Sequence, residues 1–491
     1  MEDLRIVRTV ECARRQRRAV GFSAVTVVMS LLVVGLCVRD GVGSPPEYKS
    51  FGRRQRIDHN PDQDDLMRIW VVYVGQGDGL LIQLPSRCNY DTDPTDDNTN
   101  RTERVDILID GGSHSTGNRT LMQDFLLRLY QEPVTIEHAV ITHHDADHVR
   151  GLIHMLSGDS VGVDSIYHNG LASYRRNKRG FRNSTTAKEA VRSTSGGQLT
   201  RGMAFLEDAD DGHGKKLRDT DLIAGMDDLE ERFNNDEFQG IYEDLAAAVI
   251  DKQNPMEVRL FQRCAESGSF DSFIGEREEA LDRGVDLSGI EFELLWPLPR
   301  ARKYGGWSET INGNSVTFRL DYGEFSMLFT GDMNERSEEK LIEHLGDPVS
   351  SEALDVDVMK VPHHGSWHAY EPFFRRRADG GGYVRPVLSV ASMGKTGFTT
   401  SWRHPSTEVI RWLGGSHRVY HTLIHEKRFR WSDLQTRADR ERMHEISHIL
   451  IETDGEWFCL VEVSALDGDP ADPGTVRDTR RSHGTRWISA N

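Results

Sequence analysis

Residues 142–148 hold the side chains of this sequence that are best suited to chemistry. They read Thr-His-His-Asp-Ala-Asp-His, so three imidazoles and two carboxylates fall between His143 and His148. Burying any of these groups without a partner costs on the order of several kcal/mol, so a packed core disfavours this composition. Imidazole and carboxylate are common ligands of divalent metal ions. The segment therefore predicts a metal site.

The residues just before this segment indicate what holds it. Residues 138–141 include an apolar run that is typical of a short buried strand, so the polar cluster begins where a strand ends. In α/β proteins, ligands bind at the carboxyl ends of strands. Residues 105–109 predict another strand, which ends at Asp110. An aspartate in that place can orient a metal-bound histidine through its second ring nitrogen.

Composition limits the function. The chain has 491 residues, enough for about three domains or for one large domain with insertions. Its formal net charge of −18 speaks against a basic surface that binds duplex nucleic acid, because neutralising phosphates needs Lys and Arg. Five cysteines without a Cys-x-x-Cys pair indicate neither a disulfide framework nor a zinc ribbon. Any metal chemistry must therefore come from His and Asp.

The N-terminal segment predicts membrane attachment. Residues 1–18 are basic towards their end, and residues 19–38 form an uncharged apolar run of 20 residues, long enough to span a bilayer as a helix. The positive residues before it place the N-terminus in the cytoplasm and the rest of the chain outside. We interpret 19–38 as an uncleaved signal anchor; a cleaved signal peptide, followed by secretion, is the alternative. Residues 39–65 then read as a linker.

Three motifs together resemble the metallo-β-lactamase superfamily, specifically the extracytoplasmic hydrolase domain of ComEC-type DNA-uptake proteins. They are residues 73–78 (Tyr-Val-Gly-Gln-Gly-Asp), 108–112 (Leu-Ile-Asp-Gly-Gly) and 142–148. Asp145 stands where the superfamily usually has a second histidine, a replacement that the ComEC-like branch shares. Arg150 departs from the usual Asp-His-x-Gly-Gly continuation and adds a cation near the site.

Later motifs extend the resemblance. Residues 330–332 (Thr-Gly-Asp) follow a predicted strand, and the family's aspartate in this place can bridge two metals, which implies that role for Asp332. Residues 357–366 resemble the segment that supplies a histidine to the second metal. His364 is our choice there, with His363 as the other candidate. His404, in Arg-His-Pro-Ser, resembles the family's late histidine near the site.

The resemblance implies an α/β fold, the αββα sandwich of the family. We expect it to cover residues 66–465, interrupted by a largely helical insertion at about 171–287. Residues 466–491 are polar and are predicted to be a disordered tail.

The resemblance also implies two divalent ions, zinc or manganese, that activate a shared hydroxide. Asp147 would additionally orient this hydroxide, and Asp110 is the candidate for orienting a histidine. His144 is, with His363 and His404, a further candidate for metal or substrate binding. The implied ligands are His143 and Asp145 for one metal, Asp147, His148 and His364 for the other, and Asp332 between them.

The implied reaction is phosphodiester hydrolysis, with single-stranded DNA outside the cytoplasm as the leading substrate. A basic stretch near residues 174–182 interleaves cations with aromatics, a composition that suits a single strand, although a solvated loop is the simpler interpretation. A metal-dependent hydrolase of a lactone or β-lactam, and a non-catalytic metal-stabilised scaffold, are the alternatives. The candidate phosphate contacts are Arg175, Arg176, Lys178 and Arg179.

The anchor predicts where the mature protein begins. If residues 19–38 stay attached, the protein should sediment with membranes and resist extraction by high salt, because a spanning helix is held by its apolar surface. Mass spectrometry of the purified protein should then detect peptides from residues 1–18. A soluble protein whose N-terminus lies after Val38 would contradict the anchor and support the cleaved signal.

Overall fold

The computed structural model describes most of the region between residues 66 and 464 and two short strands outside it. These described parts are separated by several gaps. They are residues 48–49, 66–85, 88, 105–113, 115–131, 133–175, 207–210, 212–217, 222–252, 257–260, 287, 289–297, 301–346, 352–374, 383–384, 386–394, 404–414, 419–425, 444–464 and 487–489.

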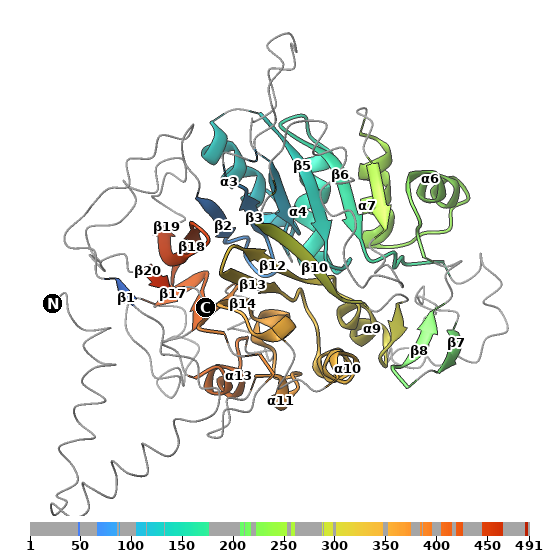
Figure 1. Ribbon diagram of the computed structural model, residues 1–491. Helices are drawn as coiled ribbons and strands as arrows, with labels where there is room; N and C mark the ends of the chain where they lie inside the picture. Colours follow the sequence, from blue (N-terminus) through green and yellow to red (C-terminus); the bar gives the residue numbers. More distant parts are fainter. Residues whose placement is uncertain are drawn as a thin grey trace, which may run out of the picture.

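The larger sheet has eleven strands in the described residues and mixes two kinds of pairing (Figure 1). β2, β3 and β4 pair antiparallel, whereas β4, β5, β6 and β9 pair parallel. In spatial order the strands are β1 (Tyr48–Lys49), β20 (Trp487–Ser489), β19 (Trp457–Ser464), β18 (His444–Thr453), β2 (Met67–Val71), β3 (Leu80–Gln83), β4 (Asp106–Ile109), β5 (Val134–Ile141), β6 (Val161–His168) and β9 (Glu257–Leu260), with β17 (Leu423–His425) paired to β18.

A second sheet has six strands in the described residues. Its first three strands pair antiparallel, and β13, β14, β15 and β16 pair parallel. In spatial order they are β10 (Ile290–Trp296), β12 (Thr317–Tyr322), β13 (Phe325–Phe329), β14 (Val358–Lys360), β15 (Leu388–Ala391) and β16 (Val419–His421).

Alternation along the strands explains why the two sheets pack face to face. Successive side chains of a strand point to opposite faces. On β2, Ile69 and Val71 face the core between the sheets, whereas Trp70 lies in the core on the outer face. On β13, Met327 belongs to the core between the sheets and Leu328 to the core beyond the second sheet. Each sheet is therefore apolar on both faces and needs a covering layer.

Helices supply these covering layers. One group packs on the outer face of the larger sheet, and the other on the outer face of the second sheet. The described layers thus run helix, sheet, sheet, helix, and this mixed α/β arrangement fits the fold that the resemblance implies (Figure 1). The first group is α3 (Leu121–Tyr130), α4 (Ala146–Leu156), α6 (Met226–Asn234) and α7 (Ile241–Ile250); the second is α10 (Glu335–Leu345), α11 (Glu371–Phe374) and α13 (Thr407–Trp412).

In its described part, the predicted insertion at 171–287 contains the helices α6 and α7 and also short strands. These are β9 and the strands β7 (Glu207–Asp210) and β8 (Lys215–Leu217), of which β7 and β8 form a small sheet with β11 (Arg302–Lys303). The sequence reading missed these strands because runs of three or four residues carry almost no periodic signal. β9 becomes a strand through its pairing with β6.

The terminal predictions fall mostly outside the described residues. No described helix has both the length and the apolar character needed to cross a membrane, and the predicted anchor at 19–38 lies outside the described residues. The predicted linker includes β1, and the predicted disordered tail includes β20, which pairs with β1 and β19. Within the predicted tail, residues 487–489 thus form a strand because β19 offers them backbone partners.

Parallel strands bring the chemically interesting residues together. Asp110 follows β4, residues 142–148 follow β5, and Asp332 and His364 follow β13 and β14. All these strand ends are carboxyl ends, and they meet where the two sheets adjoin. The loop after β4 and the start of α4 touch through backbone atoms: Gly111 N donates to His148 O at 2.7 Å, and Gly151 N to Gly112 O at 2.9 Å.

This close backbone contact predicts an unusual effect at Gly151. Alanine normally stabilises a helix interior by about 1 kcal/mol relative to glycine. A Cβ at Gly151, however, would lie 2.0 Å from Gly111 O. We expect Gly151→Ala to lower the free energy of unfolding by about 1–3 kcal/mol, as overpacking does, measured by denaturant titration. Gly158→Ala is the control, because its Cβ would come no nearer than 3.6 Å to another atom. Equal stability of the two variants would contradict the backbone contact.

Candidate metal centre

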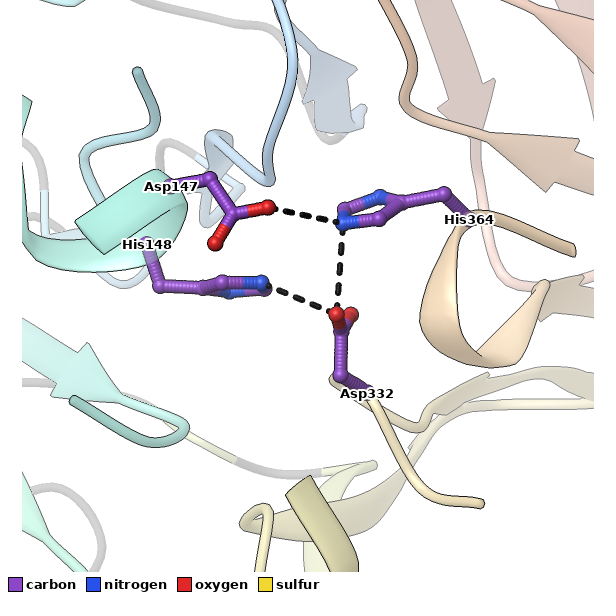
Figure 2. Close-up of side chains that lie close together, drawn as sticks. All are labelled: Asp147, His148, Asp332 and His364. Carbon is purple, nitrogen blue, oxygen red and sulfur yellow. Dashed lines mark ion pairs between the residues drawn. The ribbon is translucent and has the colours of Figure 1, made fainter. Parts of the chain in front are cut away.

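Four side chains converge to form the candidate metal centre. Asp147 and His148 lie in the first turn of α4, Asp332 in the loop after β13, and His364 in the turn η7 (Pro362–Gly365) after β14 (Figure 2). One ligand atom from each lies within 4.8 Å of the others. Two of these residues follow a strand of the larger sheet, and two follow strands of the second sheet. The centre therefore forms only when the two sheets pack against each other.

The distances at the centre suit a shared cation. His148 Nε2 lies 3.3 Å from Asp332 Oδ2, and His364 Nε2 lies 3.2 Å from the same oxygen. His364 Nε2 is also 3.6 Å from Asp147 Oδ2. The Nε2 atoms of both histidines and Asp332 Oδ1 are buried without a hydrogen-bond partner. Buried polar atoms are normally paired, so these unpaired atoms beside carboxylates fit a divalent ion.

Asp110 fixes the orientation of His148. Its Oδ2 lies 2.8 Å from His148 Nδ1. The same carboxylate accepts hydrogen bonds from Thr142, from the backbone N at 2.8 Å and from Oγ1 at 2.6 Å. A carboxylate that accepts from Nδ1 leaves the Nε2 lone pair free to face the centre. The predicted orienting role of Asp110 therefore has the geometry that it requires.

His364 is oriented by a backbone carbonyl. Its Nδ1 lies 2.9 Å from Ser392 O, and a carbonyl oxygen can only accept, so this nitrogen carries the proton. Nε2 therefore faces Asp147 and Asp332. His363 and His364 adopt φ values of 45° and 53°, in the left-handed region that costs non-glycine residues about 1–3 kcal/mol. Such strain is found where the surrounding structure imposes a functional geometry.

Burial and nearby negative charge shift the pKa values of the two histidines, His148 and His364, in opposite directions. Burial alone lowers the pKa of His148, but Asp332 and Asp110 outweigh it and raise that pKa well above its usual value. Burial also lowers the pKa of His364, and Asp332 and Asp78 raise it well above its usual value. Without metal, both histidines are thus held in the protonated form. A metal ion must displace these protons.

The other predicted metal ligands lie beside this group. His143 Nε2 is 3.9 Å from Asp145 Oδ2, and the rings of His143 and His148 are 4.0 Å apart. Burial, and then the charge of Asp147, raise the pKa of Asp145 to about 7. Within the described residues, His143 and Asp145 do not belong to a compact group of three ligand atoms. The second metal therefore stays a prediction.

His144 points away from the centre. Its Nε2 lies 3.1 Å from Ser173 Oγ, and its ring packs edge-on against Tyr242 of α7 at 5.2 Å. Burial lowers its pKa to about 3, so it is neutral. The structure thus gives His144 a packing role between the metal strand and the insertion, not a place among the ligands.

His363 and His404 border the centre. His363 Nε2 is 3.8 Å from Asp332 Oδ2, and the His404 ring lies 5.5 Å from the ring of His363 and 6.2 Å from that of His364. Burial, and then the electrostatic effect of the neighbouring His364 and His363, lower the pKa of His404 to about 3. A neutral imidazole next to the ligands can donate one hydrogen bond to an anionic substrate.

Arg175 is engaged within the insertion. Its guanidinium lies 2.6 Å from Glu243 and 3.2 Å from Asp236, and it also donates to Phe238 O. These contacts tie the segment after β6 to α7 and to the residues just before it, and two carboxylates already balance this cation. The other candidate phosphate contacts, Arg176, Lys178 and Arg179, lie outside the described residues.

The sequence reading missed Asp78 and Lys360. Both residues lie in motifs that carry the resemblance, Asp78 in residues 73–78 and Lys360 in residues 357–366, but neither was given a role. Both side chains are only 1% exposed, and Lys360 Nζ lies 2.6 Å from Asp78 Oδ2, directly behind His364. One feature of the sequence indicates such a pair. A lysine lies within the apolar run of residues 358–361, and a buried lysine is almost always paired with an opposite charge.

The protonated histidines predict proton release on metal binding. Their raised folded pKa stabilises the metal-free fold below the unfolded pKa, and this contribution is lost as pH rises through the folded pKa. Zinc affinity should accordingly increase with pH. Calorimetric titration with zinc at pH 7, in two buffers of different ionisation enthalpy, should show protons released.

A matched pair of variants distinguishes the histidines of the centre from other buried histidines by their effect on proton release. His364→Ala should reduce proton release, whereas His448→Gln should not, because burial already lowers the pKa of His448 to about 3. Zinc heats that are the same in both buffers would contradict the protonation of these ligands.

Comparison with known families supports the N-terminal half of the centre. The model of the metallo-beta-lactamase superfamily matches residues 101–194, the stretch that carries Asp110 and residues 142–148. Asp332 and His364 lie beyond it. No curated protein matches the chain. The superfamily match and the Asp/His cluster together indicate a metal-dependent hydrolase.

Proposed function

We propose that this chain is a metal-dependent phosphodiesterase of ComEC-like type that acts on single-stranded DNA or a related phosphodiester. The observation that carries the proposal is the buried group of Asp147, His148, Asp332 and His364, whose histidine Nε2 atoms lack partners. No nucleophilic Ser or Cys is needed in such a site. Two zinc or manganese ions would lower the pKa of a bound water and stabilise charge on phosphate oxygens.

The chain's own residues have distinct tasks. Asp147 is partly exposed, with 20% of its side chain accessible, so it can both hold a cation and accept a hydrogen bond that orients an attacking water. Asp110 keeps the His148 ring turned towards the centre. His363 and His404 border the centre, and burial lowers the pKa of both, so they can donate hydrogen bonds to phosphate oxygens without adding charge.

An exposed aromatic pair favours a nucleic-acid substrate. Trp367 is 57% exposed, an unusual state for such a large apolar side chain, and its ring lies 3.7 Å from that of His368. The pair follows His364 closely, and His368 O accepts from Glu335 N at 3.1 Å, next to the loop of Asp332. Aromatic rings beside a phosphate-binding centre suit the stacking of unpaired bases.

Features of the sequence support the proposed location and partner. The apolar run at 19–38 supports attachment to the cell membrane by a single span, with the catalytic domain outside the cytoplasm. The proposed partner is therefore a single-stranded nucleic acid outside the cytoplasm. The net charge of −18 is consistent with binding through metal ions and stacking, not through a basic surface.

The test is a turnover panel on the purified protein. With zinc or manganese we expect cleavage of labelled single-stranded DNA and of bis-p-nitrophenyl phosphate, and no cleavage of nitrocefin. Asp332→Asn should lower the phosphodiesterase rate at least about 100-fold, since it removes a ligand charge. Asp321→Asn, the same change at a carboxylate paired with Arg319 on β12, should have little effect.

Other outcomes would replace the proposal. Cleavage of nitrocefin alone would make the protein a hydrolase of carbonyl substrates. Absence of turnover with every metal, together with tight binding of a protein partner, would favour a non-catalytic scaffold.

A further inference from the structure

A buried ion pair lies behind the metal centre and takes no part in the ligand set. Asp78 lies in the turn between β2 and β3 of the larger sheet, and Lys360 ends β14 of the second sheet. Lys360 Nζ contacts Asp78 Oδ2 at 2.6 Å and donates to Val361 O at 3.0 Å. Both side chains are 1% exposed, so the pair bridges the two sheets in the interior. Removing two charges from water costs several kcal/mol per ion, so the pair requires an explanation.

The contacts of Asp78 with His364 explain why the buried ion pair is present. Asp78 Oδ1 lies 3.2 Å from His364 Nδ1, but the Nδ1 proton is directed to Ser392 O. Asp78 Oδ1 therefore has no hydrogen-bond partner although it is buried. The carbonyl already determines which ring nitrogen is protonated. What the carboxylate adds to the histidine is negative charge at close range.

The same arrangement occurs on the other histidine of the centre. Asp110 faces His148 Nδ1 as Asp78 faces His364 Nδ1, at 2.8 and 3.2 Å. Asp78, Asp110 and His148 also have ligand atoms within 4.8 Å of one another. Two carboxylates this close repel each other, and Lys360 places a positive charge beside one of them. The ammonium thus offsets the charge of Asp78.

We propose that Asp78 is a positioning residue whose charge makes His364 a stronger metal ligand, and that Lys360 is the built-in counter-ion that balances this carboxylate. This inference rests on the metal centre of the proposed function and is independent of the substrate. A carboxylate behind a ligating histidine increases the electron density at the ligating nitrogen, and losing such a partner typically weakens metal binding about 10–100-fold.

A purely structural bridge between the sheets is the competing explanation. The double variant Asp78→Asn/Lys360→Met separates the two, because it removes both charges while nearly preserving shape. Replacing both members of a buried pair by uncharged groups is often neutral for stability, whereas removing one leaves an uncompensated charge. Lys360→Met alone is therefore expected to be the least stable variant.

The experiment measures zinc affinity and unfolding of the full chain side by side. We expect the double variant to unfold at nearly the denaturant concentration of the unchanged protein but to bind zinc about 10–100-fold more weakly. The control is Arg68→Met/Glu452→Gln. This pair, at 3.3 Å, joins β2 and β18 near the strand ends opposite the metal centre, and its removal should leave zinc affinity unchanged.

Three results would overturn the proposal. A folded double variant with zinc affinity within about twofold of the unchanged protein would leave Asp78 with a structural role only. If the double variant does not fold, Asp78→Asn alone decides, because its amide oxygen can still accept from Lys360; unchanged affinity there overturns the proposal equally. An unchanged protein that binds no zinc refutes the metal centre itself, a failure that is distinct from the other two.

Discussion

The structure depends on one constraint: charged groups removed from water must be paired. At the meeting point of the two sheets, His148 lies between Asp110 and Asp332, and His364 lies against Asp332 and Asp78. Every contact that orients these rings uses Nδ1, so the Nε2 atoms are left facing one another across Asp332. A cation completes this pairing, and this explains why so polar a group can be buried at all.

The backbone around the centre is shaped to hold this geometry. Asp110, His363 and His364 all have positive φ, and Gly77 lies so close to α4 that a Cβ there would be 1.7 Å from Asp147 O. These conformations are unfavourable in isolation and persist only where packing imposes them. Here the packing comes from parallel strands of both sheets, whose carboxyl ends place the ligands on short turns with little freedom.

The insertion at 171–287 helps to hold the metal centre in place through its helix α7. Tyr242 and Val249 of α7 belong to the core that covers α4, and α4 carries Asp147 and His148. His144 contributes to the same contact by packing against Tyr242. The insertion is therefore part of the layer that holds the first turn of α4, and changes in it would reach the metal centre through packing.

Sequence alone determined the strands next to the site and the polar cluster that follows one of them. Residues 143–148 stand out because polar, metal-binding side chains directly follow an apolar run, a local pattern that needs no knowledge of the fold, whereas the role of Asp332 was implied only by the family resemblance. The strand predicted at 105–109 corresponds to β4 (Asp106–Ile109), and the strand predicted before residues 330–332 is β13 (Phe325–Phe329). Amphipathic periodicity and turn residues are local properties, so they can be read along the chain.

Tertiary structure alone decided which histidine nitrogens face the centre and which charges stand behind them. His143 and His144 are neighbours of one type, yet only His143 lies beside His148, because the two side chains point in different directions after β5. The pairing of Asp78 with Lys360 joins residues 282 positions apart. Electrostatic interactions depend on distance in space and on burial, and both arise only when the two sheets pack together.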